Sequence, residues 1–444
     1  MKNLLALSAL ALLAGAPLMA QQSVALSLGD AARLAAVQAP AATAAIAHAD
    51  AADARVVTAR SELYPSLSAT GFDGQHTFNT ASFGIDFPTA PGQPPLFDPN
   101  GTILGPVRLP DYRISASLTL FDLAARRRVG TARAGATAEH AGADAAADEA
   151  ATSAANAYII LQRAEALVDA RTADSVLASD LLTIARQQLD AGVTIALDVT
   201  RAQAQLADAR SDIVQARRDR DLARLLLLRR LGLPLDARVE LRDSLDVRIP
   251  ATEPTADSLV AAALSSRTDV IAARATVDAA RERVSASRAE YFPTVSVFGD
   301  QGVTGKSYSY LLPTYSYGIE LKVPLFDGWR RSSHNQESSA LLRESQIRQK
   351  DAEQRAAADV RGALVVLQSA RERVVAARER LTLGERELAE SRERFATGVA
   401  GNTDVVLAAS SLNRARTTLV DALSSFHAAR VELARAQGAI RSMP

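Results

Sequence analysis

The sequence predicts a mainly α-helical protein with a small antiparallel β part, built from one structural unit that occurs twice. Three observations lead to this prediction. Aromatic residues make up only 5% of the 444 residues, while alanine, arginine, leucine and glutamate abound, a composition typical of long helices. Apolar residues recur every seven positions in both halves, and four shorter segments alternate between polar and apolar residues. Finally, two motifs of the first half return in the second.

The repeated motifs define how the chain is organised. The segment Glu62–Ala69 returns in altered form as Glu290–Val297, 228 residues later. A pattern of Gly-Val, four residues and Asp-Val occupies 192–199 and returns at 398–405, 206 residues later. Such duplication indicates a structural element that packs against its own copy. We expect a first repeat over residues 21–232, a linker over 233–256 and a second repeat over 257–444.

The chain begins with what reads as a secretory signal peptide, residues 1–20. Lys2 supplies a positive start, and the apolar run Leu4–Ala14 is too short to span a membrane. Pro17 and Ala20 fit a cleavage region. The alternative is a buried N-terminal helix, but the segment has neither caps nor an amphipathic period. After residue 20 no apolar stretch reaches the 18 residues of a membrane-spanning helix.

The helical parts follow a heptad pattern. One line of large residues and a second line of alanines, three residues further on, form the seam of a left-handed coiled coil. The large residues are Val405, Leu412, Leu419, Phe426 and Leu433, and the alanines are Ala408, Ala415, Ala422, Ala429 and Ala436. Alanine lets the partner backbone approach closely. The segment from Leu367 to Phe395 has the same pattern, and the first half repeats it with breaks.

Two such segments joined by a glycine-bearing loop predict an antiparallel helical hairpin in each repeat. The outgoing helix 123–190 contains no proline and would be about 102 Å long at ~1.5 Å per residue. Each repeat therefore reads as one long helix beside two shorter ones that stack end to end. In the first repeat these are 123–190, 28–63 and 198–232; in the second, 329–396, 257–291 and 404–438. The hairpin tips fall at Ala191–Leu197 and Thr397–Thr403.

Four segments with a period of two predict β-strands that have one wet and one apolar face. They are 66–72, 113–120, 294–298 and 316–323, paired into hairpins through loops at about 79–110 and 305–313. Strands of ~9–11 residues suit a transmembrane β-barrel. Four strands cannot close a barrel, and lipid does not tolerate open edges, so a membrane location requires several copies. The alternative is a soluble sheet packed on the helices.

Aromatic residues gather at the ends of the predicted strands, as in the belts that anchor proteins at membrane interfaces. They are Tyr64, Phe121, Tyr291, Phe292, Phe326 and Trp329. The alternative is that these rings fill a core.

The order of these elements resembles the TolC-like outer membrane efflux proteins over nearly all of the mature chain. A helix, Tyr-Pro or Phe-Pro, a β-hairpin, a long helix, a glycine tip, Asp-Val and a return helix occur twice. Most specific are Val323–Gly328 together with the tip that runs from Phe395 to Val405. The resemblance implies a homotrimer with a shared 12-stranded outer membrane β-barrel, continued by an α-helical barrel across the periplasm. It also implies an inner-membrane pump and a periplasmic adaptor protein as partners.

The resemblance further implies where a periplasmic gate and a selectivity element would lie. In the family, the Asp198 position is bridged by a phenol and an arginine from the second tip. These positions hold Phe395 and Ala400, so this polar bridge is absent here. The family also places two rings of carboxylates at the Asp404 and Leu407 positions, of which only Asp404 is acidic here. One ring, attracting cations, would remain.

The hairpin tips also carry the expected docking surface for the adaptor. By resemblance it comprises Ala191, Gly192 and Val193 in the first tip, and Thr397, Gly398 and Val399 in the second. Read from the residues alone, Gly192 and Gly398 are C-caps of the outgoing helices. Asp198 and Asp404 read as N-caps of the return helices, a role that does not exclude the gate.

The sequence carries no pattern of an enzyme or of a cofactor site. Cysteine is absent, the five histidines are scattered, and no phosphate-binding loop or nucleophile motif occurs. Fifty basic and fifty acidic residues leave no net field that would attract nucleic acid. We therefore expect a passive exit duct of a tripartite efflux or type I secretion system, located in the outer membrane. The alternative function is a periplasmic coiled-coil adaptor or spacer, and the cargo is left open.

Overall fold

The computed structural model describes residues 24–83, 101–246, 255–397, 399 and 401–444. The expected signal peptide, residues 247–254 of the expected linker and part of the first long loop lie outside the described residues. The chain divides into two compact units. One contains the residues up to 47 with 141–271 and 351–444, and the other contains 48–140 and 272–350. Helices α3, Leu123–Asp190, and α7, Arg330–Ala396, contribute residues to both units, as do the shorter helices over 40–61 and 268–289.

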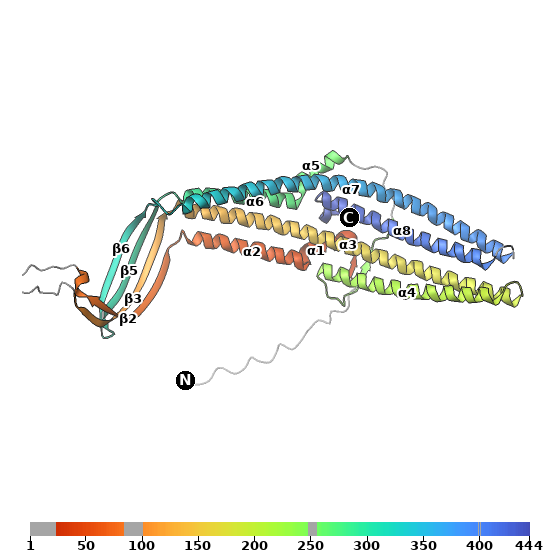
Figure 1. Cartoon of the computed structure of the whole chain (residues 1–444), viewed down its shortest axis with the longest axis horizontal. Helices are drawn as coiled ribbons and strands as arrows, with labels where there is room; N and C mark the ends of the chain where they lie inside the picture. Colours follow the sequence, from red (N-terminus) through yellow and green to blue (C-terminus); the bar gives the residue numbers. More distant parts are fainter. Residues whose placement is uncertain (1–23, 84–100, 247–254, 398, 400) are drawn as a thin grey trace, which may run out of the picture. The chain divides into compact units, whose positions relative to one another are not determined.

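The secondary structure is mainly helical and repeats itself along the chain (Figure 1). Two runs of helix, helix and strand agree in length, and every bound of the second lies 228 residues after its counterpart. The first run is α1 Leu28–Gln38, α2 Pro40–Ser61 and β2 Ser66–Asn79; the second is α5 Ala256–Ser266, α6 Thr268–Ala289 and β5 Thr294–Ser307. The offset is the one that separates the sequence motifs.

The prediction of one continuous helix over 28–63, and of another over 257–291, is wrong. The first breaks at Ala39, whose ψ of 140° is extended. Pro40 causes this break, because its ring disfavours the helical conformation of the residue before it. The second breaks at Arg267, with ψ of 125°, although no proline follows.

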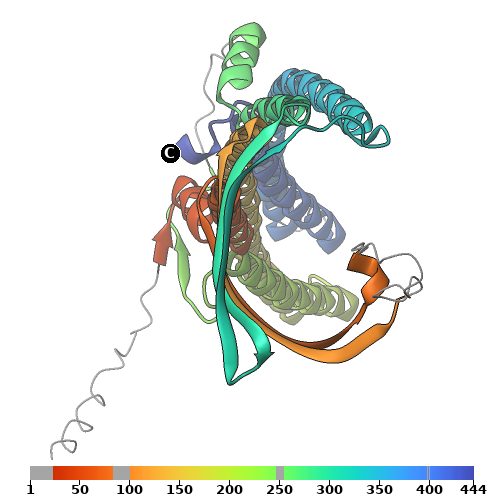
Figure 2. The same ribbon diagram turned by 90° about the vertical axis from the view of Figure 1, so that its left-hand side faces the viewer.

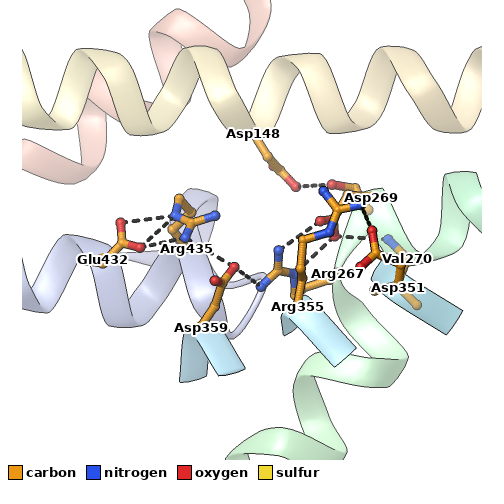
Figure 3. A network of polar contacts seen from close by, with 10 residues as sticks. Asp148, Arg267, Asp269, Val270, Asp351, Arg355, Asp359, Glu432 and Arg435 are labelled. Atoms are coloured by element: carbon orange, nitrogen blue, oxygen red, sulfur yellow. Dashed lines mark hydrogen bonds and ion pairs between the residues drawn. The ribbon is translucent and has the colours of Figure 1, made fainter. Parts of the chain in front are cut away.

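A network of ion pairs surrounds the second break (Figure 3). Arg267 is 5% exposed and donates to Asp269 at 3.0 and 2.7 Å and to Asp359 of α7 at 2.9 Å. The Thr268 hydroxyl donates to Asp148 of α3 at 2.7 Å. The second break, at Arg267, is therefore accompanied by contacts with two other helices. The first break is instead explained by a proline.

The four long helices are confirmed, with bounds within two residues of those predicted. They are α3 Leu123–Asp190, α4 Ala196–Leu231, α7 Arg330–Ala396 and α8 Asn402–Ala436. The heptad pattern explains their packing. Val405, Leu412 and Phe426 are at most 3% exposed, and they belong to two apolar clusters with α7 residues such as Val374 and Leu388. A third cluster joins α3 to α4 through alanines and leucines.

The return helices end against the breaks of the short helices, where α1 is followed by α2 and α5 by α6. Gly232 ends α4 and Gly438 follows α8, with φ of 71° and 70°. A Cβ on Gly232 would lie 2.6 Å from the Gln38 carbonyl oxygen, and one on Gly438 would lie 3.0 Å from the Arg267 Cα. The positive φ and the close approach both require glycine at these two positions.

A small parallel sheet, β1 Val24–Leu26 with β4 Val239–Leu241, was not predicted. Its strands are three residues long, too short to carry a period. It lies over an alanine-rich core formed by α1, α3 and α4, in which Tyr158 is fully buried. The Tyr158 hydroxyl donates to the Leu26 carbonyl at 3.1 Å. The Asp243 carboxylate accepts a 2.6 Å hydrogen bond from the Leu28 backbone.

The second unit carries a four-stranded antiparallel sheet in the order β2-β3-β5-β6. The predicted strands are confirmed but are longer than expected, since β3 runs over Ile103–Phe121 and β6 over Tyr310–Lys322. The sheet is strongly curved (Figure 2). Among the described residues, β2 and β6 each pair with a single strand, so both form open edges.

Candidate functional site

The strand register sorts the side chains of the sheet onto two different faces. Ser68 of β2 lies opposite Ser115 of β3, which lies opposite Asp300 of β5, which in turn lies opposite Ser316 of β6. This face is rich in hydroxyl groups. The intervening positions form an apolar face, because successive side chains of a strand point in opposite directions. The predicted alternation is confirmed.

The apolar face is exposed rather than covered by helices. Six of its large side chains are each more than half exposed: Leu67, Ile114, Tyr315, Tyr317, Ile319 and Leu321. A soluble sheet packed on the helices would have buried them, so that alternative is wrong for this chain. A contiguous apolar surface of this kind is typical of an interaction with lipid or with another protein.

The aromatic residues at the strand ends are exposed as well. Phe326 and Trp329 are 75% and 72% exposed. Their rings are arranged edge to face, with the ring centroids 6.1 Å apart. Tyr64, Tyr291 and Phe292 are about half exposed or more, and Phe121 is 39% exposed. The interpretation of these rings as core filling is therefore wrong.

The strand exits place an aspartate just before each of the two outgoing helices, α3 and α7. The Asp122 carboxylate accepts the backbone N–H of Ala125 at 2.8 Å at the start of α3. Asp327 accepts the side chain of Arg331 at 2.7 Å, and this arginine is 5% exposed. Gly328 and Trp329 have φ of 66° and 69°, so the chain turns sharply before α7. The Leu-Phe-Asp motif thus sets the junction between strand and helix in both repeats.

The first hairpin tip has the geometry predicted for its glycine. Gly192 has φ of 73°, and its N–H donates to the Leu189 carbonyl at 3.0 Å. Val193 donates to the Gln188 carbonyl at 2.9 Å. This is the Schellman pattern of a helix C-terminus. The prediction that Gly192 is a C-cap glycine is confirmed.

The second tip contains the matching bond, from the Val399 N–H to the Arg394 carbonyl at 2.9 Å. Gly398 and Ala400 lie outside the described residues. The tip residues that are described form an exposed surface: Ala191, Gly192, Val193, Thr397 and Val399. Their expected role in docking an adaptor remains a prediction.

The prediction that Asp198 and Asp404 are N-caps is wrong. The N-caps are Ile195 and Gly401, neither of which makes a side-chain capping bond. Both aspartates lie in the first turn instead, where a negative charge is favoured by the helix dipole. Asp198 accepts the Thr194 hydroxyl at 2.6 Å and is partly buried, whereas Asp404 is exposed. Asp404 thus presents an exposed carboxylate at the tip.

Leu407, at the second of the two positions that carry carboxylates in the resembled family, is 59% exposed. It lies within one turn of Asp404 on α8.

A pair of amide side chains joins the two tips, and sequence reasoning missed it. The Asn402 amide donates to the Asp198 backbone carbonyl at 3.1 Å. In the reverse direction, Gln188 donates to the Phe395 carbonyl at 3.0 Å. Phe395 itself is 4% exposed and packs against Val405. Hydrogen bonds from these two amide side chains therefore connect the tips, where the resembled family has a phenol and an arginine.

Two further observations concern the described residues only. None of the helices within them combines the length and the hydropathy needed to cross a membrane. Across the same residues, no group of three or more His, Cys, Asp or Glu side chains is placed to hold a metal ion.

Known proteins resemble this chain in sequence and in fold. The family model described as "Outer membrane efflux protein" matches residues 31–233 and 259–439. The alkaline protease secretion protein AprF of Pseudomonas aeruginosa is 28% identical over 224 residues, 45% of this chain and 46% of the relative. The fusaric acid resistance protein FusA of Burkholderia cepacia is 30% identical over 218 residues, 47% and 41% respectively. The chain thus spans about half the length of the curated relatives it matches.

The fold is also that of solved outer membrane proteins. The outer membrane protein VceC of Vibrio cholerae superimposes with a TM-score of 0.72 at 19% identity, over 93% of this chain and 96% of the other. At this identity the likeness establishes the fold alone. The family model, in contrast, accounts for both repeats of elements and nearly all described helices. This chain therefore belongs to the outer membrane efflux protein family.

Proposed function

We propose that the protein is the outer membrane exit duct of a tripartite efflux or type I secretion system. The single observation that carries this proposal is the exposed apolar face of a sheet with two open edges. Neither feature is stable in water, and open edges are not tolerated in lipid. When copies of the chain join their sheets into one closed barrel, the open edges are paired and the apolar face lies toward lipid.

The number of copies in the proposal is three, which gives a 12-stranded barrel. The antiparallel order supports closure, because β2 and β6 run in opposite directions. An edge β6 can therefore continue the antiparallel pattern with β2 of the next copy. Each copy would also contribute its two helical hairpins to a periplasmic tube, and cargo would move passively through the common lumen.

The proposed partners are a periplasmic adaptor and an inner-membrane pump, which would meet the hairpin tips. The exposed valines Val193 and Val399 support this assignment, since unpaired apolar side chains on a turn favour a protein contact. Family members are efflux proteins and not enzymes, so the proposal includes no catalytic step and no cofactor. The printed names of the relatives span protease secretion and fusaric acid resistance. The proposal therefore leaves the cargo class open.

The alternative of a periplasmic adaptor or spacer has less support. The matching family is one of outer membrane efflux proteins. An adaptor also has no need for four strands with an exposed apolar face.

Interchain disulfides test the proposed barrel directly, because the chain has no cysteine of its own. Ala69→Cys on the open edge β2 is combined with a cysteine at Tyr315, Tyr317 or Ile319 on the open edge β6. All four positions lie on the apolar face. We expect oxidation in outer membrane fractions to give a ladder that ends at three chains for at least one pair. Absence of any interchain band in all three pairs would contradict the shared barrel.

A further inference from the structure

Three charged side chains form a cluster near the middle of the sheet. The Arg113 guanidinium of β3 donates to Asp111 at 2.8 Å and to Asp300 of β5 at 3.0 Å. The Ser316 hydroxyl of β6 donates to the other oxygen of Asp300. Three adjacent strands thus fix one arginine and two carboxylates in a defined arrangement.

The register places this cluster on the polar face. Arg113 lies opposite Thr70 and Gly302, and Asp300 lies opposite Ser115 and Ser316. A Cβ on Gly302 would be 2.6 Å from the Arg113 Cβ. The glycine therefore leaves the space over β5 that the arginine side chain occupies.

The cluster carries a net charge of about −1, because one guanidinium faces two carboxylates. Its side chains are only 34%, 21% and 16% exposed for Arg113, Asp111 and Asp300, so they are held in place rather than dispersed in solvent. A second ion pair among the described residues of the sheet, Arg108 with Asp73, lies on the opposite face and is neutral as a pair. The polar face alone therefore holds a fixed excess negative charge in mid-sheet.

We propose that Asp111, Arg113 and Asp300 form a charge-selective site in the wall of the duct, which favours cationic over anionic solutes. This inference rests on the proposed function, since only a closed barrel with its apolar face in lipid turns the polar face toward a lumen. Each copy would add one such site at the same level. Fixed charges act on mobile ions within about 10 Å at 0.1 M salt, so the sites would raise the cation concentration along the wall.

Two opposite charge changes test the proposal in planar lipid bilayers, with the reversal potential in a KCl gradient as the readout. Arg113→Gln leaves two carboxylates, and we expect the potassium-to-chloride permeability ratio to rise about twofold. The double change Asp111→Asn with Asp300→Asn leaves the guanidinium alone, and we expect the ratio to fall about twofold. Arg113→Lys keeps the charge and should leave the ratio within about 20% of wild type.

The matched control is Asp73→Asn, which removes one carboxylate on the opposite face of the same sheet. The proposal predicts an unchanged ratio for this variant. Equal ratios for wild type, Arg113→Gln and the double variant would overturn the selective site while the channel persists. The cysteine ladder described above identifies variants that fail to insert into the membrane. Arg113→Lys keeps the charge and changes the shape of the side chain, so it shows which of the two sets the permeability ratio. Absence of channels in the wild-type protein would contradict the proposed function instead.

Discussion

The side-chain amide of Asn402 donates a hydrogen bond to the backbone carbonyl of Asp198, 3.1 Å away, and so ties the start of α8 to the first turn of α4. Gln188 makes the reciprocal bond to the Phe395 carbonyl. In both amides the oxygen is buried and has no partner among the described residues. The two hairpin tips of one chain are thus held together by two directional hydrogen bonds.

Asn402→Asp is expected to loosen the tips with little change in shape. The new carboxylate has no N–H to donate and would face the Asp198 carbonyl at a position that is 2% exposed. Losing a buried hydrogen bond costs about 1 kcal/mol, and burying a charge adds to that. We expect amide hydrogen exchange at the tips to accelerate at least about fivefold at pH 7.

The charge-matched control is Thr403→Asp, which adds the same carboxylate at the next, exposed position. It should leave exchange at the tips nearly unchanged, because solvent hydrates the new charge. Equal acceleration in both variants would mean that charge at the tip, and not the hydrogen bond from the Asn402 side chain, controls the stability of the tip. Lowering the pH slows intrinsic exchange in every variant, so protection factors are compared. These should return toward the wild-type value in Asn402→Asp alone, since a protonated carboxyl group can donate.

The contacts of the ends of α4 and α8 with the helix breaks predict that replacing either of two glycines destabilises the protein. In Gly232→Ala and Gly438→Ala, a Cβ would meet Gln38 and Arg267 at 2.6 and 3.0 Å, in a backbone conformation that L-residues disfavour. We expect each change to destabilise the detergent-solubilised protein by about 2 kcal/mol. Thermal unfolding measures this loss.

Gly142→Ala and Gly362→Ala are matched controls, because these glycines are helical and a Cβ there meets nothing within 4 Å. They should stabilise the protein slightly, by up to about 1 kcal/mol. A loss of the same size in all four variants would exclude close packing as the cause.

Arg267 is expected to stabilise the α5–α6 break. Arg267→Leu leaves Asp269 and Asp359 without their shared cation, but both carboxylates are partly solvated. We expect a loss of about 2 kcal/mol in thermal or chemical unfolding. Arg281→Leu removes an exposed pair with Asp278 and should change stability by no more than about 0.5 kcal/mol.

The same network predicts a pH dependence. Burial raises the pKa of Asp269, but hydrogen bonds and charge from Arg267 outweigh burial and hold this pKa below its ordinary 3.8. A lowered carboxylate pKa contributes stability above pH 3.8 that is lost as the pH falls through the folded-state value. The difference in Tm between wild type and Arg267→Leu should therefore shrink below about pH 4. A constant difference down to pH 2.5 would contradict this contribution of Asp269.

Asp404 is the exposed carboxylate of the second tip, and Asp404→Asn is expected to reduce the cation preference of the channel. The physical reason is the loss of one negative charge per copy at the mouth of the duct. Reversal potentials in a KCl gradient measure the effect. Asp190→Asn, at the end of α3, provides a control of equal charge in the other tip. An unchanged preference in Asp404→Asn would exclude an acidic ring.

Much of the fold could be predicted from the sequence because its helices are long. A line of alanines such as Ala408 and Ala415, when it continues over many heptads, predicts two helices that pack closely against each other. The break before Pro40 was missed, although the sequence does carry a signal for it, since proline restricts the residue before it. The break at Arg267 carries no such signal, because Asp359 and Asp148, which contact it, come from other helices. Strands as short as Val24–Leu26 carry no periodic signal.

The candidate site was less accessible to sequence reasoning. Gly192 could be assigned because a helix that ends before a glycine has few alternatives. Asp198 and Asp404 were assigned to the N-cap position, but each is the third residue of its helix. The two positions are hard to tell apart because both favour aspartate. Asn402 and Gln188 gave no signal at all. An amide beside a turn acquires a partner only when the second hairpin is brought to it.

We propose that this chain closes its sheet only as part of a barrel that several copies share in lipid. The most direct measurement is the mass of the protein extracted from outer membranes in mild detergent, by light scattering corrected for bound detergent. We expect three chains in each particle and precipitation when detergent is removed. A single chain that stays dissolved in plain buffer would contradict the shared barrel.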